Sequence, residues 1–229
     1  MLVAAQEREL GGLVRLLGPA EALQWPVDYS VRLRLPRADW FLVANGAGRG
    51  RASEALRAAL VRQRFDAIVS TGFCGGLDPA LEPGGIVAAT EVSAVDYAGR
   101  RRAEAPRTGR DFAKGPLVTA GRVVLSAAEK AELRSRGFLA VEMEAAGVAA
   151  EVPPGVPFYC VRAITDTAGE TLRIDLNEAR DALGRIDDVR VVRCALRRPL
   201  RGVPELWRLF RRSRLAAERL GEFLADCEF

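Results

Sequence analysis

Residues 40–50, WFLVANGAGRG, lead directly into residues 52–64, ASEALRAALVRQR, and this junction decides the fold class. The first five residues are all apolar, which is typical of a strand that is covered on both faces. Residues 52–64 have apolar side chains at helical spacing. The glycines between the two segments allow a tight turn from strand to helix. A strand that passes through a turn into a helix is the repeating unit of α/β proteins.

The same alternation continues along the chain. Further strands are predicted at residues 67–70, 86–89, 117–119, 139–141 and 158–164, and shorter helices at residues 127–136 and 144–151. The alternation predicts an α/β fold with a largely parallel sheet. No internal repeat or low-complexity linker divides the sequence. We therefore expect one domain over residues 1–229, with residues 1–189 as its main, catalytic body and residues 190–229 as a basic, amphipathic, helical C-terminal extension.

The composition excludes several kinds of catalytic and metal site. The 229 residues are 49% hydrophobic and 28% charged, and they include no histidine. The chain therefore cannot form a Ser-His-Asp or Cys-His catalytic centre or an HExxH zinc site. The four cysteines form no CxxC pair, so we expect core cysteines in a reducing compartment and no metal site. Proton transfer is left to Asp, Glu, Tyr, Lys or the substrate itself.

Hydropathy favours a cytoplasmic location. No apolar run approaches the ~18 residues that a membrane-spanning helix needs. The first ten residues, MLVAAQEREL, lack the basic and apolar regions of a secretory signal. We therefore expect a cytoplasmic protein.

Positive charge is concentrated near the C-terminus. The net charge is +4, and residues 190–220 hold ten arginines against two glutamates, whereas residues 1–189 are close to neutral. From Pro204 onward the pattern predicts an amphipathic helix, because proline suits the first turn of a helix. The apolar face would hold Leu206, Leu209, Phe210, Ala217, Leu220 and Leu224, and the opposite face Arg208, Arg211, Arg212 and Arg219.

Two interpretations of this helix remain open. Its apolar face could enter a membrane interface while the arginines meet anionic headgroups. Alternatively, Leu206, Phe210, Leu220 and Leu224 pack on the main body and the arginines face water. A module that binds nucleic acid is not favoured, because few aromatic residues accompany the arginines and the main body is near neutral. We expect no nucleic-acid partner.

Two glycine-rich motifs could carry chemistry, and each has a purely structural alternative. Residues 46–50 could bind an anion with their backbone amides, or they could simply make the turn into the helix. Gly72, Gly75 and Gly76 follow a strand, and ligands bind beyond the carboxyl ends of strands in open α/β sheets. These glycines would let a ligand approach the backbone closely, or they would form another turn.

Two further motifs contain carboxylates. In residues 141–146, VEMEAA, a strand is predicted to run into a helix with Glu142 and Glu144 on one side. A carboxylate there could accept hydrogen bonds from ribose hydroxyls, or it could favour the start of the helix. In residues 158–166, FYCVRAITD, a buried strand ends in Asp166, where a carboxylate is costly unless paired or protonated. Asp166 is thus a candidate catalytic group, or it caps an exposed turn.

Five segments together resemble the nucleoside phosphorylase/nucleosidase superfamily, specifically its methylthioadenosine/S-adenosylhomocysteine nucleosidases. They are Ala5-Gln-Glu-Arg-Glu-Leu10, Asn45-Gly-Ala-Gly-Arg49, Thr71-Gly-Phe-Cys-Gly-Gly-Leu77, Val141-Glu-Met-Glu-Ala-Ala146 and Val161-Arg-Ala-Ile-Thr-Asp166. They occur in the family's order within residues 4–166. The resemblance implies an α/β fold with three layers, αβα, around a twisted mixed sheet. It also implies an enzyme that cleaves N-glycosidic bonds of nucleosides, uses no cofactor and forms a homo-oligomer.

The resemblance also implies roles for particular residues. Asp166 would be the acid at purine N7, and Glu9 would be the carboxylate that activates water. Glu144 would accept the ribose hydroxyls, with Met143 packed on the sugar. The remaining site residues would be Val124 and Leu125 in the base pocket, and Phe73, Arg162, Gly46 and Arg49 around the nucleophile or phosphate.

These roles agree with the chemistry of the bond. Breaking ribose from adenine builds oxocarbenium character on the sugar and negative charge on the base. A protonated Asp166 would neutralise the leaving base, and we expect burial to keep it protonated. An ionised Glu9 would take a proton from water, as in glycosidases, where two carboxylates flank the bond. Neither step needs histidine.

One departure from the family bears on the nucleophile. Phosphorylases of the superfamily carry an arginine before the Thr-Gly motif to hold phosphate, and this chain has Ser70 there. That difference argues against phosphorolysis, although Arg49, Arg51 and Arg162 could still supply cations. Water and phosphate therefore both remain open as the nucleophile.

A second departure bears on the substrate. Residues 196–224 are similar to the tail of hopanoid-associated phosphorylases, which are thought to remove adenine from adenosylhopane. We therefore expect adenine release from an adenosyl substrate, with adenosylhopane in hopanoid lipid biosynthesis as the first choice. Such a substrate would bring residues 203–225 into peripheral contact with the inner membrane. The alternative is a methylthioadenosine/S-adenosylhomocysteine nucleosidase or a purine nucleoside phosphorylase that acts on soluble nucleosides.

Overall fold

The computed structural model describes residues 1–179, 187–197 and 199–229. Within these residues, ten strands form one mixed sheet and six helices accompany it. The strands are β1 (Leu2–Ala4), β2 (Glu21–Ala22), β3 (Tyr29–Arg34), β4 (Asp39–Ala44), β5 (Ile68–Gly76), β6 (Ile86–Ala94), β7 (Tyr97–Arg102), β8 (Ala113–Thr119), β9 (Ala140–Glu142) and β10 (Phe158–Asp166). The helices are α1 (Glu7–Leu17), α2 (Arg49–Leu60), α3 (Ala127–Ser135), α4 (Ala145–Glu151), α5 (Asp188–Leu196) and α6 (Pro199–Asp226). The predicted α/β alternation is confirmed.

One end of the sheet closes on itself. The strand order is β10-β6-β8-β9-β5-β1-β4-β3-β2, with β7 paired to β6. Because β5 also pairs with β10, the strands β5, β10, β6, β8 and β9 form a closed ring. The β5–β10 pair is parallel, whereas the β5–β9 pair is antiparallel. The ring brings Gly75 of β5 level with both Val141 of β9 and Asp166 of β10.

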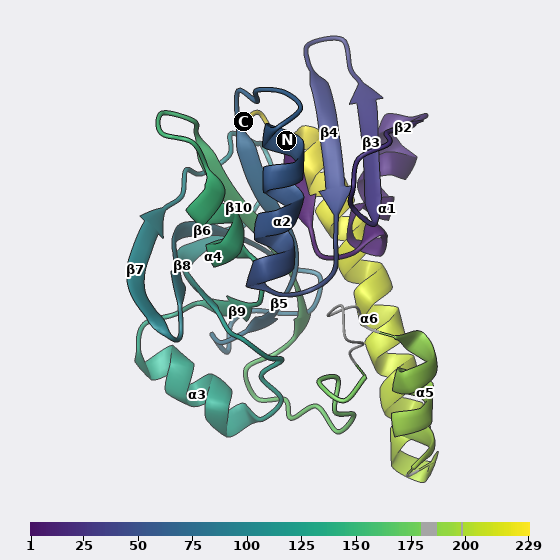
Figure 1. Ribbon diagram of the computed structural model, residues 1–229. Coiled ribbons are helices and arrows are strands. Elements are labelled where there is room, and N and C mark those ends of the chain that lie inside the picture. The colour runs from purple at the N-terminus through teal and green to yellow at the C-terminus, as the bar shows by residue number, and fades with distance from the viewer. Residues whose placement is uncertain (180–186, 198) are drawn as a thin grey trace.

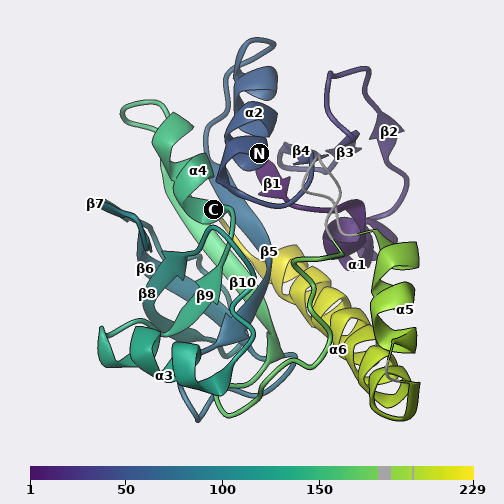
Figure 2. The ribbon, with the colours of Figure 1, turned by 60° about the horizontal axis from the view of Figure 1, so that its bottom comes forward.

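Helices cover both faces of the sheet. On one face, Leu56 of α2 and Val148 of α4 are fully buried in a core that includes Val87 of β6. On the other face, Leu10 of α1 and Leu220 of α6 are fully buried in a second core. Figures 1 and 2 show α2 and α4 on the opposite side of the sheet from α6. The three-layer αβα sandwich is therefore confirmed.

Strand β5 is longer than its sequence pattern predicted. It runs from Ile68 to Gly76, whereas the pattern predicted a strand over residues 67–70 only. The alternative in which Gly72, Gly75 and Gly76 form a turn is wrong, because β9 and β10 hold the glycine-rich half of β5 in an extended conformation on both edges.

The C-terminal helix begins earlier than predicted. Helix α6 starts at Pro199, so Pro204 lies inside it rather than in its first turn. Proline has no N–H and leaves one helical carbonyl without a donor, that of Leu200. Leu200 is 93% exposed, so water can bond to this carbonyl. Helix α5, which precedes α6, was not predicted as a separate helix.

The two halves of α6 have different surroundings. The second half belongs to the core, where Leu220 and Leu224 are fully buried. The first half leaves Trp207 62% exposed and Phe210 58% exposed. The interpretation that Leu220 and Leu224 pack on the main body is therefore confirmed. For Phe210 the same interpretation is wrong, because this side chain is exposed.

Two glycines let α1 and α6 approach each other closely. A Cβ on Gly12 would lie 2.1 Å from the carbonyl oxygen of Ala217, and a Cβ on Gly221 would lie 2.4 Å from the carbonyl carbon of Gly12. Both distances are too short for real side chains, so only glycine fits at this crossing. Because Glu9 lies in the first turn of α1, the contact also determines where this carboxylate stands.

Gly221→Ala is expected to lower the free energy of unfolding by about 2 kcal/mol, because overpacking a tight contact costs ~1–3 kcal/mol. Urea unfolding followed by circular dichroism measures the change. Gly11→Ala is the matched control, since a Cβ there meets only the end of the Arg15 side chain at 4.0 Å. Alanine in a helix interior should be neutral or slightly stabilising. A Gly221→Ala variant as stable as the wild type would contradict the close approach.

Candidate active site

Four buried carboxylates gather where β5, β9 and β10 meet the starts of α1 and α4. Glu9 lies in the first turn of α1, Glu142 ends β9, Glu144 immediately precedes α4, and Asp166 ends β10. All four residues are buried. A buried carboxylate needs hydrogen-bond donors or a cation. The partners of each carboxylate therefore indicate what it can do.

Asp166 is bonded through both carboxylate oxygens. Thr165 Oγ1 donates to Oδ1 over 2.8 Å, and the ammonium of Lys130 forms an ion pair with Oδ2. Lys130 is itself completely buried. Gly75 leaves room for the carboxylate, since a Cβ there would lie 3.0 Å from Oδ2. From the sequence, burial was expected to be the main influence on the Asp166 carboxyl group. The structure adds a second influence, because the buried ammonium of Lys130 compensates the charge of the carboxylate.

Glu9 is surrounded by backbone donors. Its Oε2 accepts hydrogen bonds from the N–H groups of Ala5 and Gln6 at 2.8 and 3.0 Å, and its Oε1 accepts one from Phe73 at 3.2 Å. Gly72, with a φ of +140°, lies against the carboxylate, so a Cβ there would be 3.0 Å from Oε1. Burial raises the pKa of Glu9, and the backbone hydrogen bonds oppose this shift. Glu9 can thus act as a base.

Glu144 connects the glycine-rich turn to α4. Its Oε1 accepts a hydrogen bond from the N–H of Gly48 at 2.8 Å, and its Oε2 accepts one from Met143 at 3.3 Å. Burial, followed by the negative charges of Glu142 and Glu9, raises the pKa of Glu144 to about 8. Glu144 therefore holds a proton at neutral pH. Hydroxyl donors from a ligand would favour its ionised form.

Glu142 and Arg162 form a buried ion pair behind these groups. Arg162 Nη2 donates to Glu142 Oε2 over 2.7 Å and to Ser70 Oγ over 2.8 Å. Glu142 also accepts hydrogen bonds from Thr119 Oγ1 and, at 2.8 Å, from the backbone N–H of Glu144. Because the completely buried side chain of Arg162 on β10 bonds to both Ser70 of β5 and Glu142 of β9, it links these three strands.

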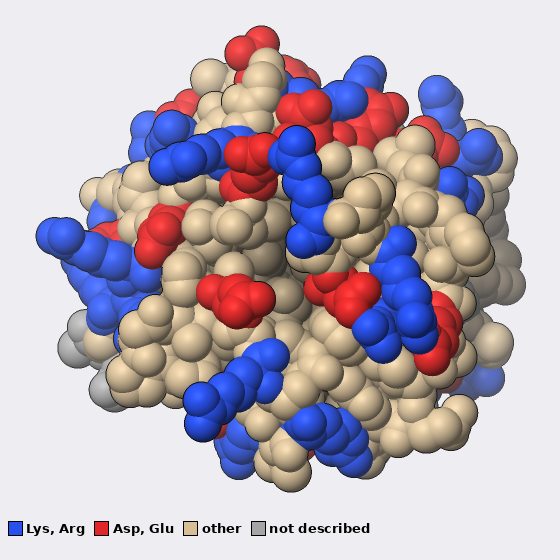
Figure 3. Space-filling view, turned by 90° about the horizontal axis from the view of Figure 1, so that it is seen from above, with Lys and Arg blue, Asp and Glu red and all other residues tan. Residues whose placement is uncertain are grey.

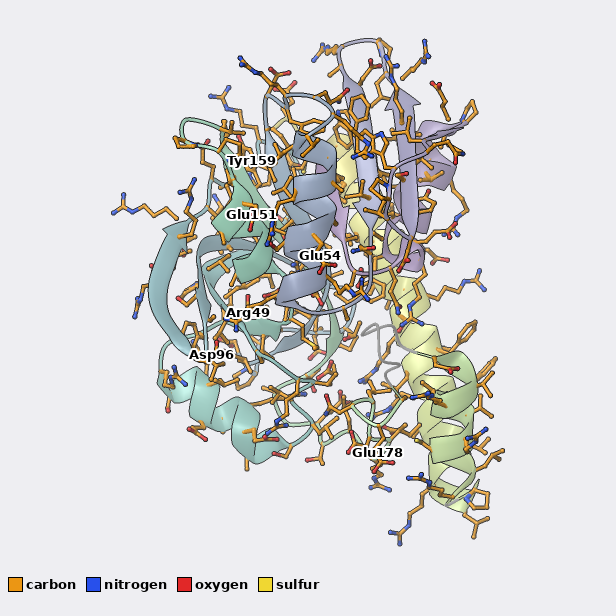
Figure 4. All side chains as sticks on the ribbon, viewed as in Figure 1. Arg49, Glu54, Asp96, Glu151, Tyr159 and Glu178 are labelled. Atoms are coloured by element: carbon orange, nitrogen blue, oxygen red, sulfur yellow. The ribbon has the colours of Figure 1, made fainter. Side chains whose placement is uncertain are left out.

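Two residues expected near a phosphate bond to other protein groups. Arg49 forms two hydrogen bonds with the carboxylate of Asp96, at 2.8 and 2.7 Å (Figure 4). The N–H of Gly46 donates to the carbonyl of Ala5 over 2.9 Å. The turn between β4 and α2 is therefore stabilised by contacts within the protein.

The residues expected in the base pocket lie in the loop before α3. The carbonyl of Leu125 accepts a hydrogen bond from the N–H of Leu172 at 2.8 Å. The side chain of Asn177 bonds to the backbone of the same loop at 2.8 and 3.1 Å. Val124 packs against the core cluster beneath the loop. These contacts attach Val124 and Leu125 to the segment that follows Asp166.

Lys130 is a site residue that was not predicted from the sequence. Its only sequence signal is rarity: Lys114 and Lys130 are the two lysines among 34 basic residues. Because lysine is so rare in this arginine-rich chain, a lysine within a predicted helix could have been singled out for that reason. Ser70 and Thr119 were likewise assigned no partner, although both bond to the buried ion pair.

Comparison with known proteins shows the family to which the chain belongs. The sequence profile of the Phosphorylase superfamily matches residues 29–109 and 93–193, more than half of the chain. The chain belongs to the phosphorylase superfamily. The 5'-methylthioadenosine/S-adenosylhomocysteine nucleosidase of Anoxybacillus flavithermus is 29% identical over 163 residues, which cover 58% of this chain and 70% of that protein. The futalosine hydrolase of Streptomyces coelicolor is 32% identical over 168 residues, which cover 59% of this chain and 70% of that protein.

A solved structure shares the fold of this phosphorylase-superfamily enzyme. The 5'-methylthioadenosine/S-adenosylhomocysteine nucleosidase of Neisseria meningitidis aligns with a TM-score of 0.69 and 20% identity, over 97% of this chain and 96% of that chain. The superfamily that the five motifs together resemble is therefore confirmed, and the chain is an enzyme of that superfamily. In the part of the chain that the structure describes, no three His, Cys, Asp or Glu side chains are grouped to hold a metal. No described helix is both long and apolar enough to cross a bilayer.

The raised pKa of Glu144 predicts how stability depends on pH. Its pKa is about 8 in the folded protein, against an ordinary value of 4.5. The folded state therefore binds this proton more tightly, and the resulting stabilisation of the fold is complete below pH 4.5 and is lost as the pH rises to about 8. Glu144→Gln should remove this loss. On going from pH 5 to pH 9, the free energy of unfolding of the variant should rise relative to that of the wild type by on the order of several kcal/mol. Chemical unfolding at both pH values measures the difference.

Glu54→Gln serves as the control, because Glu54 is an exposed acid on α2 (Figure 4). It should follow the wild-type pH dependence. Equal pH dependence in Glu144→Gln and wild type would show that Glu144 does not hold the proton.

Proposed function

We propose that this enzyme hydrolyses the N-glycosidic bond of an adenine nucleoside and releases adenine. The observation that carries the proposal is the pair of carboxylates set against two glycines of one strand. Glu9 lies at Gly72 and Asp166 at Gly75, three residues further along β5, or about 10 Å at strand spacing. Cleavage of a glycosidic bond needs an acid for the leaving group and a base for water on the other side of the bond.

In this proposal Asp166 gives a proton to purine N7 as the bond between C1′ and N9 breaks. Glu9 takes a proton from the attacking water, and its negative charge faces the oxocarbenium character that develops on the sugar. Contacts to ribose and base would come from Glu144, Met143, Val124 and Leu125. The side chains therefore supply both proton transfers without histidine.

Water is the nucleophile that the contacts favour. Ser70, which stands where phosphorylases carry an arginine, bonds to Arg162 inside the protein. Arg162 is completely buried and Arg49 is paired with Asp96, so both cations are engaged. The relatives from Anoxybacillus flavithermus and Streptomyces coelicolor carry the names of a nucleosidase and a hydrolase.

Exposed apolar side chains on α5 and α6 support a lipid-linked substrate. They are Val189, Val192 and Leu196 on α5, and Leu200, Val203, Trp207 and Phe210 on α6. On each helix they recur every three or four residues and so share one face. Exposed arginines accompany them, among them Arg193, Arg201 and Arg211. Apolar and basic residues in this combination are typical of helices that lie on anionic membranes.

The position of these helices fits membrane contact. Figure 1 shows α5 and the first half of α6 projecting beyond the sheet. At the opposite end of the molecule, Figure 3 shows both acidic and basic side chains.

The first half of α6 is also connected to the candidate site. Arg208 pairs with Glu170 over 2.7 Å, and Arg212 pairs with the same carboxylate. Partial burial opposes ionisation, but hydrogen bonds from Arg212 and from the N–H of Thr167 lower the pKa of Glu170 to about 2. Glu170 follows Asp166 by four residues. A membrane-bound α6 would therefore hold the site at a lipid surface, which favours adenosylhopane, in hopanoid lipid biosynthesis, as the substrate.

Soluble nucleosides are the second candidate substrates. The observation that favours them is the name of the Anoxybacillus flavithermus relative, a 5'-methylthioadenosine/S-adenosylhomocysteine nucleosidase. In that case the exposed apolar face of α6 would be covered by a second copy of the chain.

Adenine release from adenosylhopane, methylthioadenosine and S-adenosylhomocysteine, each with and without phosphate, tests the reaction by chromatography. We expect release from adenosylhopane that does not depend on phosphate. Asp166→Asn should lower the rate about 100-fold or more, because a general acid contributes ~10²–10⁴. Full activity of this variant would overturn the assigned chemistry, and a requirement for phosphate would overturn hydrolysis.

The control for this experiment is Asp111→Asn, a substitution of an exposed acid, which should keep wild-type activity. Asp166→Asn leaves the buried ammonium of Lys130 without its partner charge, which is destabilising. Circular dichroism at the assay temperature must therefore show that the variant is folded.

Membrane contact is tested by sedimentation with phosphatidylglycerol vesicles. The double variant Trp207→Ser/Phe210→Ser should bind at least about tenfold more weakly than wild type, because two exposed apolar side chains are removed. Val61→Ser is the control, since Val61 is 85% exposed at the end of α2. Truncating α6 is unsuitable because Leu220 and Phe223 belong to the core.

Wild-type protein that fails to sediment with these vesicles would contradict membrane contact. If, in addition, light scattering shows a wild-type oligomer that Trp207→Ser/Phe210→Ser dissociates, the apolar face binds a second copy of the chain instead.

A further inference from the structure

Lys130 is a buried cation at the proposed acid. It extends from α3, is completely buried, and has three hydrogen-bond acceptors: Asp166 Oδ2, the carbonyl of Thr167 at 2.8 Å and the carbonyl of Glu170 at 3.2 Å. An ammonium has three N–H donors, so all of them are used. Burying an ammonium is costly unless its charge is paired and its donors are satisfied. The complete set of partners indicates a specific site rather than an accidental contact.

The two oxygens of Asp166 have different partners. Lys130 holds Oδ2, whereas Oδ1 accepts a hydrogen bond from Thr165 Oγ1 at 2.8 Å. The same hydroxyl lies 3.2 Å from the carbonyl of Cys74 on β5. The carboxylate is thus oriented by groups from α3, β5 and β10. Because the ammonium has no N–H left for a ligand, Lys130 acts on a reaction only through Asp166.

We propose that Lys130 is a positioning residue that orients Asp166 and stabilises the negative charge left on it after its proton has passed to the purine. This inference rests on the role of Asp166 in the proposed function. The proton moves from Asp166 to N7, and the C1′–N9 bond breaks with its electron pair on the base. Water bonds to C1′ through its oxygen and loses a proton to Glu9. Solvent then carries that proton from Glu9 back to Asp166, and the observed ion pair corresponds to Asp166 after donation.

Other titratable and charged groups face this pair from each packed element. They are Cys74 on β5, Glu170 after β10, and Glu205, Arg208 and Arg212 on α6. Burial raises the pKa of Cys74 well above its ordinary value, so this thiol stays neutral. The two acids are paired with the two arginines. Lys130 is therefore the cation that bonds directly to the carboxylate.

The test compares kcat and KM between pH 5 and 9 for wild type, Lys130→Gln and Lys130→Arg, with the adenine nucleoside that the wild type hydrolyses fastest. In Lys130→Gln, kcat should fall at least about tenfold and KM should stay within about threefold, because the lost interaction forms in the transition state. The alkaline limb of its profile should move up by about one pH unit or more, because a carboxyl without a neighbouring cation keeps its proton to higher pH. Lys130→Arg keeps the positive charge, so the alkaline limb of its pH profile should stay where it is in the wild type.

A purely structural role gives a different outcome. In that case kcat falls equally at every pH and the alkaline limb does not move. That result, or wild-type kcat in Lys130→Gln, would overturn the inference. Undiminished activity of Asp166→Asn would instead refute the proposed function, so the two failures are distinguishable.

A double variant keeps the test decisive if Lys130→Gln does not fold. Asp166→Asn/Lys130→Gln buries no lone charge and should be more stable than Lys130→Gln. If Lys130 acts through Asp166, the double variant should have the kcat of Asp166→Asn within about threefold. A further tenfold fall would show an independent role and overturn the inference.

Discussion

The burial of four carboxylates along one part of the sheet is the constraint on which the rest of the structure depends. An unpaired buried charge costs several kcal/mol, so each carboxylate needs its own solution. Glu9 relies on backbone N–H groups, whereas Glu142 and Asp166 each have a buried cation. Glu144 instead holds a proton, since its pKa is about 8. The ends of β9 and β10 and the starts of α1 and α4 must therefore meet beside β5, and the closed ring of strands achieves this.

The layers of the fold could be predicted from the sequence because local patterns carry them. Apolar runs that pass through glycine into helical patterns gave the order of most elements. The length of β5 beyond Ser70 was not predicted, because glycines usually mark a turn. Gly72 and Gly75 instead remain in the strand, where they make room for two carboxylates. That requirement arises from β9, β10 and α1, which are distant in sequence, so no local pattern could reveal it.

The candidate site was predictable only in part, for a similar reason. The family motifs singled out Glu9, Glu144 and Asp166, but they said nothing of Lys130, which is 36 residues from Asp166. Its ion pair depends on where α3 packs. The two halves of α6 also look alike as sequence, with leucines at helical spacing in both. The positions of α1 and of strands β5 and β10 decide which half is covered.

This division of α6 bears on how the enzyme can change over evolutionary time. The half that crosses α1 at Gly221 tolerates little variation, because it determines the position of the helix that carries Glu9. Within residues 199–211, every residue except Gly202 and Glu205 is exposed or only partly buried. Much of this segment can therefore vary without disturbing that crossing. One helix thus contains a part that tolerates few substitutions and a part that tolerates many. Related chains could acquire new surroundings or partners through this segment while the bond-breaking groups stay the same.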